Sequence, residues 1–175
     1  GWPPGSLSEL LAEPPGAGLG LVVPTLTRLG DEGRWMLLVS PPWSPYAPAL
    51  AARGVRLERL VVVRAEGRGA WAAEQGLRSG SCAAVLLWGG RWELAALRRL
   101  QLAAETGGAL AFLFREPAAA RQASPAPLRL ELSPAGAGYR ARVLKQRGAP
   151  AGAALDLPLA EAWRAPRETP GTAAA

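Results

Sequence analysis

Short apolar runs of strand length alternate along this chain with segments of helical periodicity. The runs are Trp35–Ser40 (WMLLVS), Leu60–Arg64, Ala83–Trp88 and Ala109–Phe114. Runs that are apolar at nearly every position are typical of strands buried on both faces of a parallel sheet. Parallel strands need a long connection between them, which is usually a helix. The pattern therefore predicts an α/β protein with a mostly parallel sheet flanked by helices.

The segments between these runs supply the expected helices. Leu94–Thr106 is the clearest, because Leu97, Leu100 and Ala104 recur at helical spacing and two glycines follow it. An earlier strand over Leu7–Ala12 leads through a Pro/Gly loop, Glu13–Gly20, into a helix that has Pro24 in its first turn. The expected helices besides Leu94–Thr106 are Leu21–Leu29, Tyr46–Arg53 and Ala70–Ser79.

Towards the C-terminus the pattern changes to an alternation of apolar and polar residues. Leu128–Leu132 and Tyr139–Leu144 alternate in this way and are separated by the turn sequence SPAGAG. They predict an antiparallel hairpin that extends the sheet. Beyond Gly148 the periodicity fades, so we expect one domain over residues 1–148 and a tail over 149–175. The tail is predicted to be disordered or to bind a partner through its large apolar side chains, Leu155, Leu157, Leu159 and Trp163.

The absence of histidine and the single cysteine exclude several kinds of chemistry. Serine and cysteine hydrolases of the triad type need a histidine, and zinc sites need Cys or His ligands that this chain lacks. Cys82 begins an apolar run, so we expect a buried, unreactive thiol. No signal peptide is visible, and the charge-free segment Trp35–Ala52 contains four prolines, which a membrane-spanning helix does not tolerate. A cytoplasmic protein without a membrane contact is therefore expected.

The chain is basic, with a formal net charge of +6, and all of its 20 basic residues except Lys145 are arginines. A basic balance is compatible with nucleic-acid binding, which would show a steep salt dependence. The arginines are scattered and form no run, so solvation of the surface explains them as well. We expect direct binding to DNA to be weak or absent.

The order of strand, glycine-rich loop and helix over residues 7–29 is the setting of a phosphate-binding loop. Such a loop needs a lysine for the phosphates and a hydroxyl residue for Mg²⁺, and AEPPGAGLG has neither. The two aspartates, Asp31 and Asp156, do not follow core strands, so a metal-binding acid is also missing. A dinucleotide site is disfavoured by the GxGxG spacing. The sequence predicts no enzymatic activity, no cofactor and no metal.

Several stretches nevertheless resemble the ImuA family, SulA-like accessory proteins of bacterial translesion synthesis within the RecA superfamily. These stretches are PPWSPYAPALAARGV, WAAEQGLRSG, ALRRLQLAAE, LAFLFR and LKQRG. The resemblance covers about residues 1–148 and implies a degenerate RecA-like core of three layers. It also implies that family residues upstream of Gly1 are missing.

The resemblance places unsuitable residues at the nucleotide-binding positions. Ala17, Gly18 and Leu19 stand where recombinases have the glycine, lysine and threonine of the phosphate loop. Trp88 stands at the metal-site aspartate, and the glutamate that activates water falls within Pro41–Trp43. The resemblance thus implies a scaffold that has lost ATP binding.

The connections that carry DNA-binding loops in recombinases are short here, at 89–93 and 116–127. Arg142, Lys145 and Arg147 fall where recombinases have a basic strand end that faces the nucleotide of a neighbouring subunit. A solvated edge strand explains these three residues equally well.

The resemblance implies a non-catalytic adaptor in SOS-induced mutagenic translesion synthesis. Its partners would be RecA and the polymerase-like protein ImuB, and indirectly an error-prone replicative-type DNA polymerase. Two alternatives stay open: a SulA-type cell-division inhibitor that acts on FtsZ, and a residual nucleotide-binding regulator.

The tryptophans divide into expected core residues and candidate contacts. Trp35, Trp71 and Trp88 lie in strand or helix patterns and are expected in the core. Trp43, Trp92 and Trp163 lie in expected loops or in the tail, where a large aromatic side chain is a candidate anchor for a partner. The preferred anchor pair is Trp43 with Tyr46, beside the proline-rich turn. Capping of the sheet edge is the alternative role for them.

Overall fold

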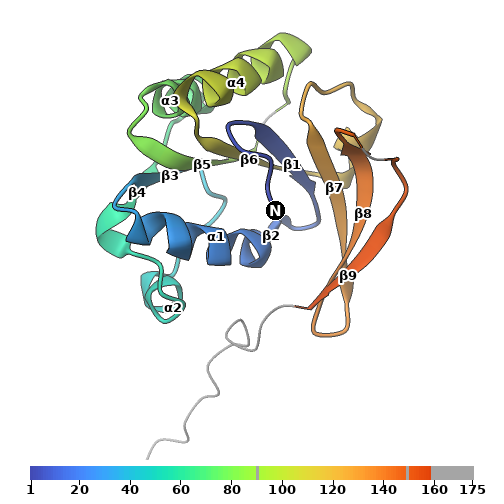
Figure 1. Ribbon diagram of the computed structural model, residues 1–175, viewed down its shortest axis with the longest axis horizontal. Helices are drawn as coiled ribbons and strands as arrows, with labels where there is room; N and C mark the ends of the chain where they lie inside the picture. Colours follow the sequence, from blue (N-terminus) through green and yellow to red (C-terminus); the bar gives the residue numbers. More distant parts are fainter. Residues whose placement is uncertain (90, 149, 159–175) are drawn as a thin grey trace, which may run out of the picture.

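A single eight-stranded sheet forms the centre of the computed structural model, which describes residues 1–158 except 90 and 149 (Figure 1). The strand order is β4-β3-β5-β6-β1-β7-β8-β9. From β4 to β7 neighbouring strands are parallel, and β8 and β9 continue the sheet antiparallel. Their bounds are β1 Leu7–Leu11, β3 Trp35–Val39, β4 Leu60–Val63, β5 Cys82–Trp88, β6 Leu110–Arg115, β7 Leu128–Ala135, β8 Gly138–Gln146 and β9 Ala154–Pro158.

Helices cover both faces of the parallel part of this sheet (Figure 1). On one face lie α1 (Leu19–Asp31) and α2 (Ala47–Ala51), and on the other lie α3 (Gly69–Arg78) and α4 (Leu94–Gly107). Successive strand residues point to opposite faces. Phe112 and Phe114 accordingly pack with the residues of α1, whereas Leu113 packs with those of α3 and α4. The prediction of a three-layer α/β core is confirmed.

The C-terminal hairpin is also confirmed, and it is longer than predicted. β7 pairs with β1 in parallel and with β8 antiparallel, so the hairpin continues the central sheet. β9 pairs with β8 and was not expected from the sequence. Within the described residues no helix combines the length and apolarity needed to cross a membrane.

Local details of the first helices differ from the prediction. α1 begins at Leu19, so Pro24 lies in its second turn, where the ring has no N–H to donate to the carbonyl of Gly20. The loop before α1 includes a short extended segment, β2 (Pro15–Gly18), and α2 is shorter than the helix predicted over 46–53. Helix limits are the least predictable feature, because competing caps within one turn differ little in free energy.

The prediction for the core tryptophans is correct only for Trp88, which is buried. Trp71 is 61% exposed, because α3 buries the side that carries Ala73 and Leu77, and Trp71 lies on the opposite side of the helix. Trp35 begins β3 and is 38% exposed, with the guanidinium of Arg59 lying over its ring. Cys82 is buried, as expected.

Candidate functional site

The glycine-rich loop after β1 is packed against large side chains. Gly16 and Gly18 have φ angles of 104° and 96°, which favour glycine. A Cβ atom at Gly16 would lie 2.6 Å from the ring of Trp43 and 3.3 Å from Nε1 of Trp88. At Gly18 it would lie 2.5 Å from Cδ1 of Leu132. Both glycines therefore let the loop contact apolar side chains closely.

Aromatic rings line the neighbourhood of this loop. Trp88 ends β5 and stacks on Phe114 of β6, with 4.7 Å between ring centroids and 5° between ring planes. Its Nε1 is buried without a hydrogen-bond partner. Trp43, which is 56% exposed, covers Gly16. Indole rings carry no charge to attract a phosphate, so this arrangement favours packing over anion binding.

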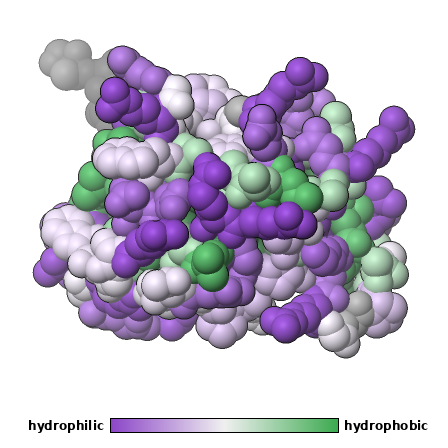
Figure 2. All heavy atoms as spheres, turned by 90° about the horizontal axis from the view of Figure 1, so that it is seen from above, coloured by the Kyte–Doolittle hydropathy of each residue, from purple (hydrophilic) through white to green (hydrophobic). Residues whose placement is uncertain are grey.

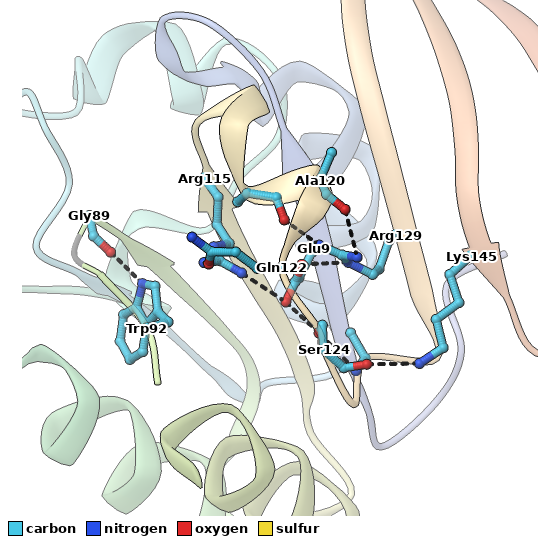
Figure 3. A network of polar contacts seen from close by, with 11 residues as sticks. Glu9, Gly89, Trp92, Arg115, Ala120, Gln122, Ser124, Arg129 and Lys145 are labelled. Carbon is cyan, nitrogen blue, oxygen red and sulfur yellow. Dashed lines mark hydrogen bonds and ion pairs between the residues drawn. The ribbon is translucent and has the colours of Figure 1, made fainter. Parts of the chain in front are cut away.

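A buried ionic cluster lies where the middle of β1 meets the end of β6 and the start of β7 (Figure 3). Glu9 of β1 lies between Arg115 of β6 and Arg129 of β7, and these three side chains are at most 8% exposed. Arg129 Nε donates to Glu9 Oε2 at 2.7 Å, and Arg115 Nη1 donates to Glu9 Oε1 at 3.4 Å. Because β1 lies between the two other strands, one carboxylate meets two guanidinium groups.

The same cluster holds the segment after β6 against the sheet. Arg129 donates to the carbonyls of Ala119 and Ala120 in the 3-10 turn Pro117–Arg121. Ser124 Oγ donates to Glu9 Oε1 at 2.6 Å, and Arg115 donates to Gln122 Oε1. Buried polar contacts thus hold residues 117–124 against the sheet.

Sequence reasoning missed this cluster. Its signal is a charged residue in each of three mostly apolar strand segments: Glu9 in LSELL, Arg115 in LAFLFR and Arg129 in LRLEL. Charged side chains are seldom fully buried unless they are paired. Burial is the main influence on the pKa of Arg115 and lowers it, while the charge of Glu9 acts in the opposite direction.

Two adjoining hollows lie at the carboxyl ends of β5 and β6, and both are lined by Gly89 and Arg91. One, of about 300 Å³, is lined by Arg115, Gln122 and residues of the segment after β6. The other, of about 480 Å³, lies between the start of α3 and the turn that contains Trp92. Ligands of α/β proteins commonly bind at the carboxyl ends of the parallel strands. Here that region contains two hollows, although side chains occupy the space above the glycine-rich loop.

The aromatic anchors predicted from the sequence lie at the surface or near it. Tyr46 is 69% exposed, and Ser44, between Trp43 and Tyr46, accepts a hydrogen bond from Arg64. Trp92 is half-buried, and its Nε1 donates to the carbonyl of Gly89. Their role in binding stays a prediction.

The predicted basic strand end is largely engaged within the molecule. Arg142 forms an ion pair with Glu131 of β7, and Lys145 donates to the carbonyl of Ser124. Arg147 lines a separate hollow near Pro127.

On the face that carries α3 and α4, hydrophilic and hydrophobic residues are interleaved (Figure 2).

The candidate tail residues fall into two groups. Leu155 and Leu157 belong to β9, where Leu155 is exposed and Leu157 packs against the core. Leu159 and Trp163 lie outside the described residues, as does the rest of the predicted tail after Pro158.

The known proteins to which this chain is similar in sequence include several cell division inhibitors named SulA. No family model matches the chain. The cell division inhibitor SulA of Edwardsiella piscicida is 35% identical over 109 residues, which are 61% of this chain and 64% of that protein. SulA of Pseudomonas aeruginosa is 34% identical over 111 residues, 61% of this chain and 69% of that protein. The chain spans about 64% of the length of the Edwardsiella relative.

Similar solved structures include a SulA protein and also a recombinase that shares the fold. The crystal structure of SulA from Pseudomonas aeruginosa has a TM-score of 0.52 at 30% identity and covers 63% of this chain and 97% of its own. The RadB recombinase has a TM-score of 0.68 at 14% identity and covers 89% of this chain and 88% of its own. The second likeness concerns the fold alone.

Proposed function

The chain belongs to the SulA family, and on that premise we propose that it is a non-catalytic adaptor of the SOS response to DNA damage. Its proposed partners are RecA and the polymerase-like protein ImuB, which it connects during mutagenic translesion synthesis. An error-prone replicative-type polymerase would join through them. The specific translesion role rests on the resemblance of the sequence to the ImuA family.

The observation that carries this proposal is a recombinase-like scaffold whose glycine loop is packed under Trp43 and Trp88. A subunit of this shape can dock where a recombinase subunit docks. It lacks the lysine and the metal-binding acid through which ATP acts on such assemblies. Binding without turnover is the activity that this arrangement supports best.

A second candidate is inhibition of cell division by binding FtsZ. The observation that favours it is the name of the relatives, which are cell division inhibitors. Sedimentation of FtsZ polymers with the purified chain separates the two candidates. If the amount of sedimented FtsZ polymer falls when this protein is present at a near-equimolar concentration, division inhibition is supported. If the amount of polymer is unchanged, the adaptor function is favoured.

The exposed aromatic pair provides the first test of the adaptor. We expect Trp43→Ala and Tyr46→Ala each to weaken binding to RecA or to ImuB by about 30-fold, because buried aromatic anchors contribute about 2 kcal/mol or more. Affinity is measured by biolayer interferometry with the purified partners. Trp71→Ala is the matched control, since this tryptophan is equally exposed on α3. Full affinity of both variants for both partners would show that this loop is not the contact.

Calorimetry with Mg-ATP tests the absence of nucleotide binding. We expect no heat of micromolar binding for the natural chain or for Trp43→Ala. The variant removes the ring that covers Gly16 but restores neither the lysine nor the hydroxyl residue of a working loop. A saturable heat with either protein contradicts this expectation and favours a nucleotide-dependent regulator.

A further inference from the structure

The buried cluster between β1, the end of β6 and the start of β7 contains more positive than negative charge. Its charged members are Glu9, Arg115 and Arg129, one carboxylate with two guanidinium groups. The side chain of Glu9 is fully buried, and those of the arginines are 4% and 8% exposed. Burial of a charge is costly unless an opposite charge and hydrogen bonds compensate it. One positive charge in this cluster lacks a full counter-charge.

The geometry assigns the surplus charge to Arg115. Glu9 is engaged closely by Arg129 at 2.7 Å and by Ser124 at 2.6 Å, whereas Arg115 lies 3.4 Å from it. Arg129 also donates to two backbone carbonyls. The close contact of Arg115 is the neutral amide oxygen of Gln122. The guanidinium of an arginine stays protonated in proteins, so Arg115 keeps its positive charge.

Arg115 and Gln122 line the hollow of about 300 Å³ at the carboxyl end of β6. Figure 3 shows them lying together between Glu9 and the turn that joins Gly89 to Trp92. Two further charged residues line the hollow, Arg91 and Glu116, and both are exposed. Its remaining walls are apolar or backbone and come from Gly89, Phe114, Ala118 and Ala119.

We propose that this hollow binds one carboxylate beside Arg115. Resting on the proposed function, the carboxylate is the side chain of an Asp or Glu that a partner protein inserts. A single surplus charge matches a monoanion, and Glu116 at the wall disfavours the dianionic form of phosphate. A guanidinium has five N–H donors, and the contacts of Arg115 with Glu9 and Gln122 leave others for a carboxylate oxygen. The alanine walls of the hollow suit the methylene stem of the side chain.

Butyrate, which has the stem and charge of a glutamate side chain, is the first probe. We expect it to raise the melting midpoint of the full chain above that in chloride at equal ionic strength, by about 3–5 °C at ten times its Kd. In the NMR spectrum of ¹⁵N-labelled chain, the Nε–Hε signal of Arg115 should shift with butyrate. Equal midpoints in butyrate and chloride, or a larger shift of the Arg115 Nε–Hε signal with sulfate or phosphate than with butyrate, would overturn the proposal, because those two salts also raise midpoints without binding.

Two exposed residues at the hollow give variants with opposite expected signs. Arg91→Gln should weaken butyrate binding about threefold, and Glu116→Gln should strengthen it by a similar factor. Neither residue belongs to the buried cluster, so both variants should fold even if Arg115→Gln does not. An unchanged Kd in both variants would overturn the site.

The partner arm uses the same variants with RecA and ImuB. Weaker partner binding in Arg91→Gln, together with competition by butyrate, supports an inserted acidic side chain. If butyrate binds but neither variant nor competition alters the partner contacts, the ligand is a free carboxylate and the proposed source is wrong. If butyrate binds and neither partner does, the adaptor function fails while the carboxylate site stands. No response to butyrate overturns the site whatever the partners do.

Discussion

Replacement of Glu9 by glutamine is expected to lower the free energy of unfolding by about 3–5 kcal/mol, the usual effect of removing one partner from a buried ionic pair. The variant leaves Arg115 and Arg129 buried beside each other without a counter-charge. It also places an amide N–H₂ group where the structure provides donors only. The measurement is equilibrium unfolding in urea, with the change taken from the midpoint at constant slope.

Glu131→Gln is the matched control for this experiment. Glu131 also pairs with an arginine, Arg142, but that arginine is mostly exposed. Exposed pairs contribute about 0–1 kcal/mol, so the control should remain close to the natural chain. If Glu9→Gln and Glu131→Gln cost the same, the three-residue cluster is solvated and does not hold the segment after β6.

Gly107→Ala should destabilise the protein by about 3 kcal/mol, at the upper end of the usual range for overpacking. A Cβ atom at this position would lie 1.8 Å from the carbonyl oxygen of Leu77 and 2.9 Å from its carbon. The obstacle is the backbone of α3, so α3 and α4 must move apart and lose the packing of the core between them. Urea unfolding measures this change as well.

Gly69→Ala carries the same substitution in the first turn of α3 and serves as its control. The nearest atom to a Cβ there is 3.6 Å away, which is ordinary contact, and the backbone is not left-handed. Alanine at such a site is neutral or stabilises by about 0.4–1 kcal/mol. Equal stability of the two variants would contradict the close approach of the helices at Gly107.

The prediction of the parallel core from sequence succeeded because its signals are local. A buried strand such as Cys82–Trp88 is apolar at every position, and α4 repeats Leu97 and Leu100 at helical spacing. The error for Trp71 has a different origin. An aromatic residue in a helical pattern is assigned to the core only if the buried face is known, and that face depends on how α3 lies against β5.

The sequence by itself determined the layered α/β architecture and the lack of histidine and of a phosphate-loop lysine. Only the tertiary structure decided that Trp43 covers Gly16 and that Glu9 meets Arg115 and Arg129. Glu9 is separated from these arginines by 106 and 120 residues along the chain. Local patterns fix which segments become strands, but the order of strands in the sheet depends on packing between distant segments. That order places one carboxylate between two guanidinium groups.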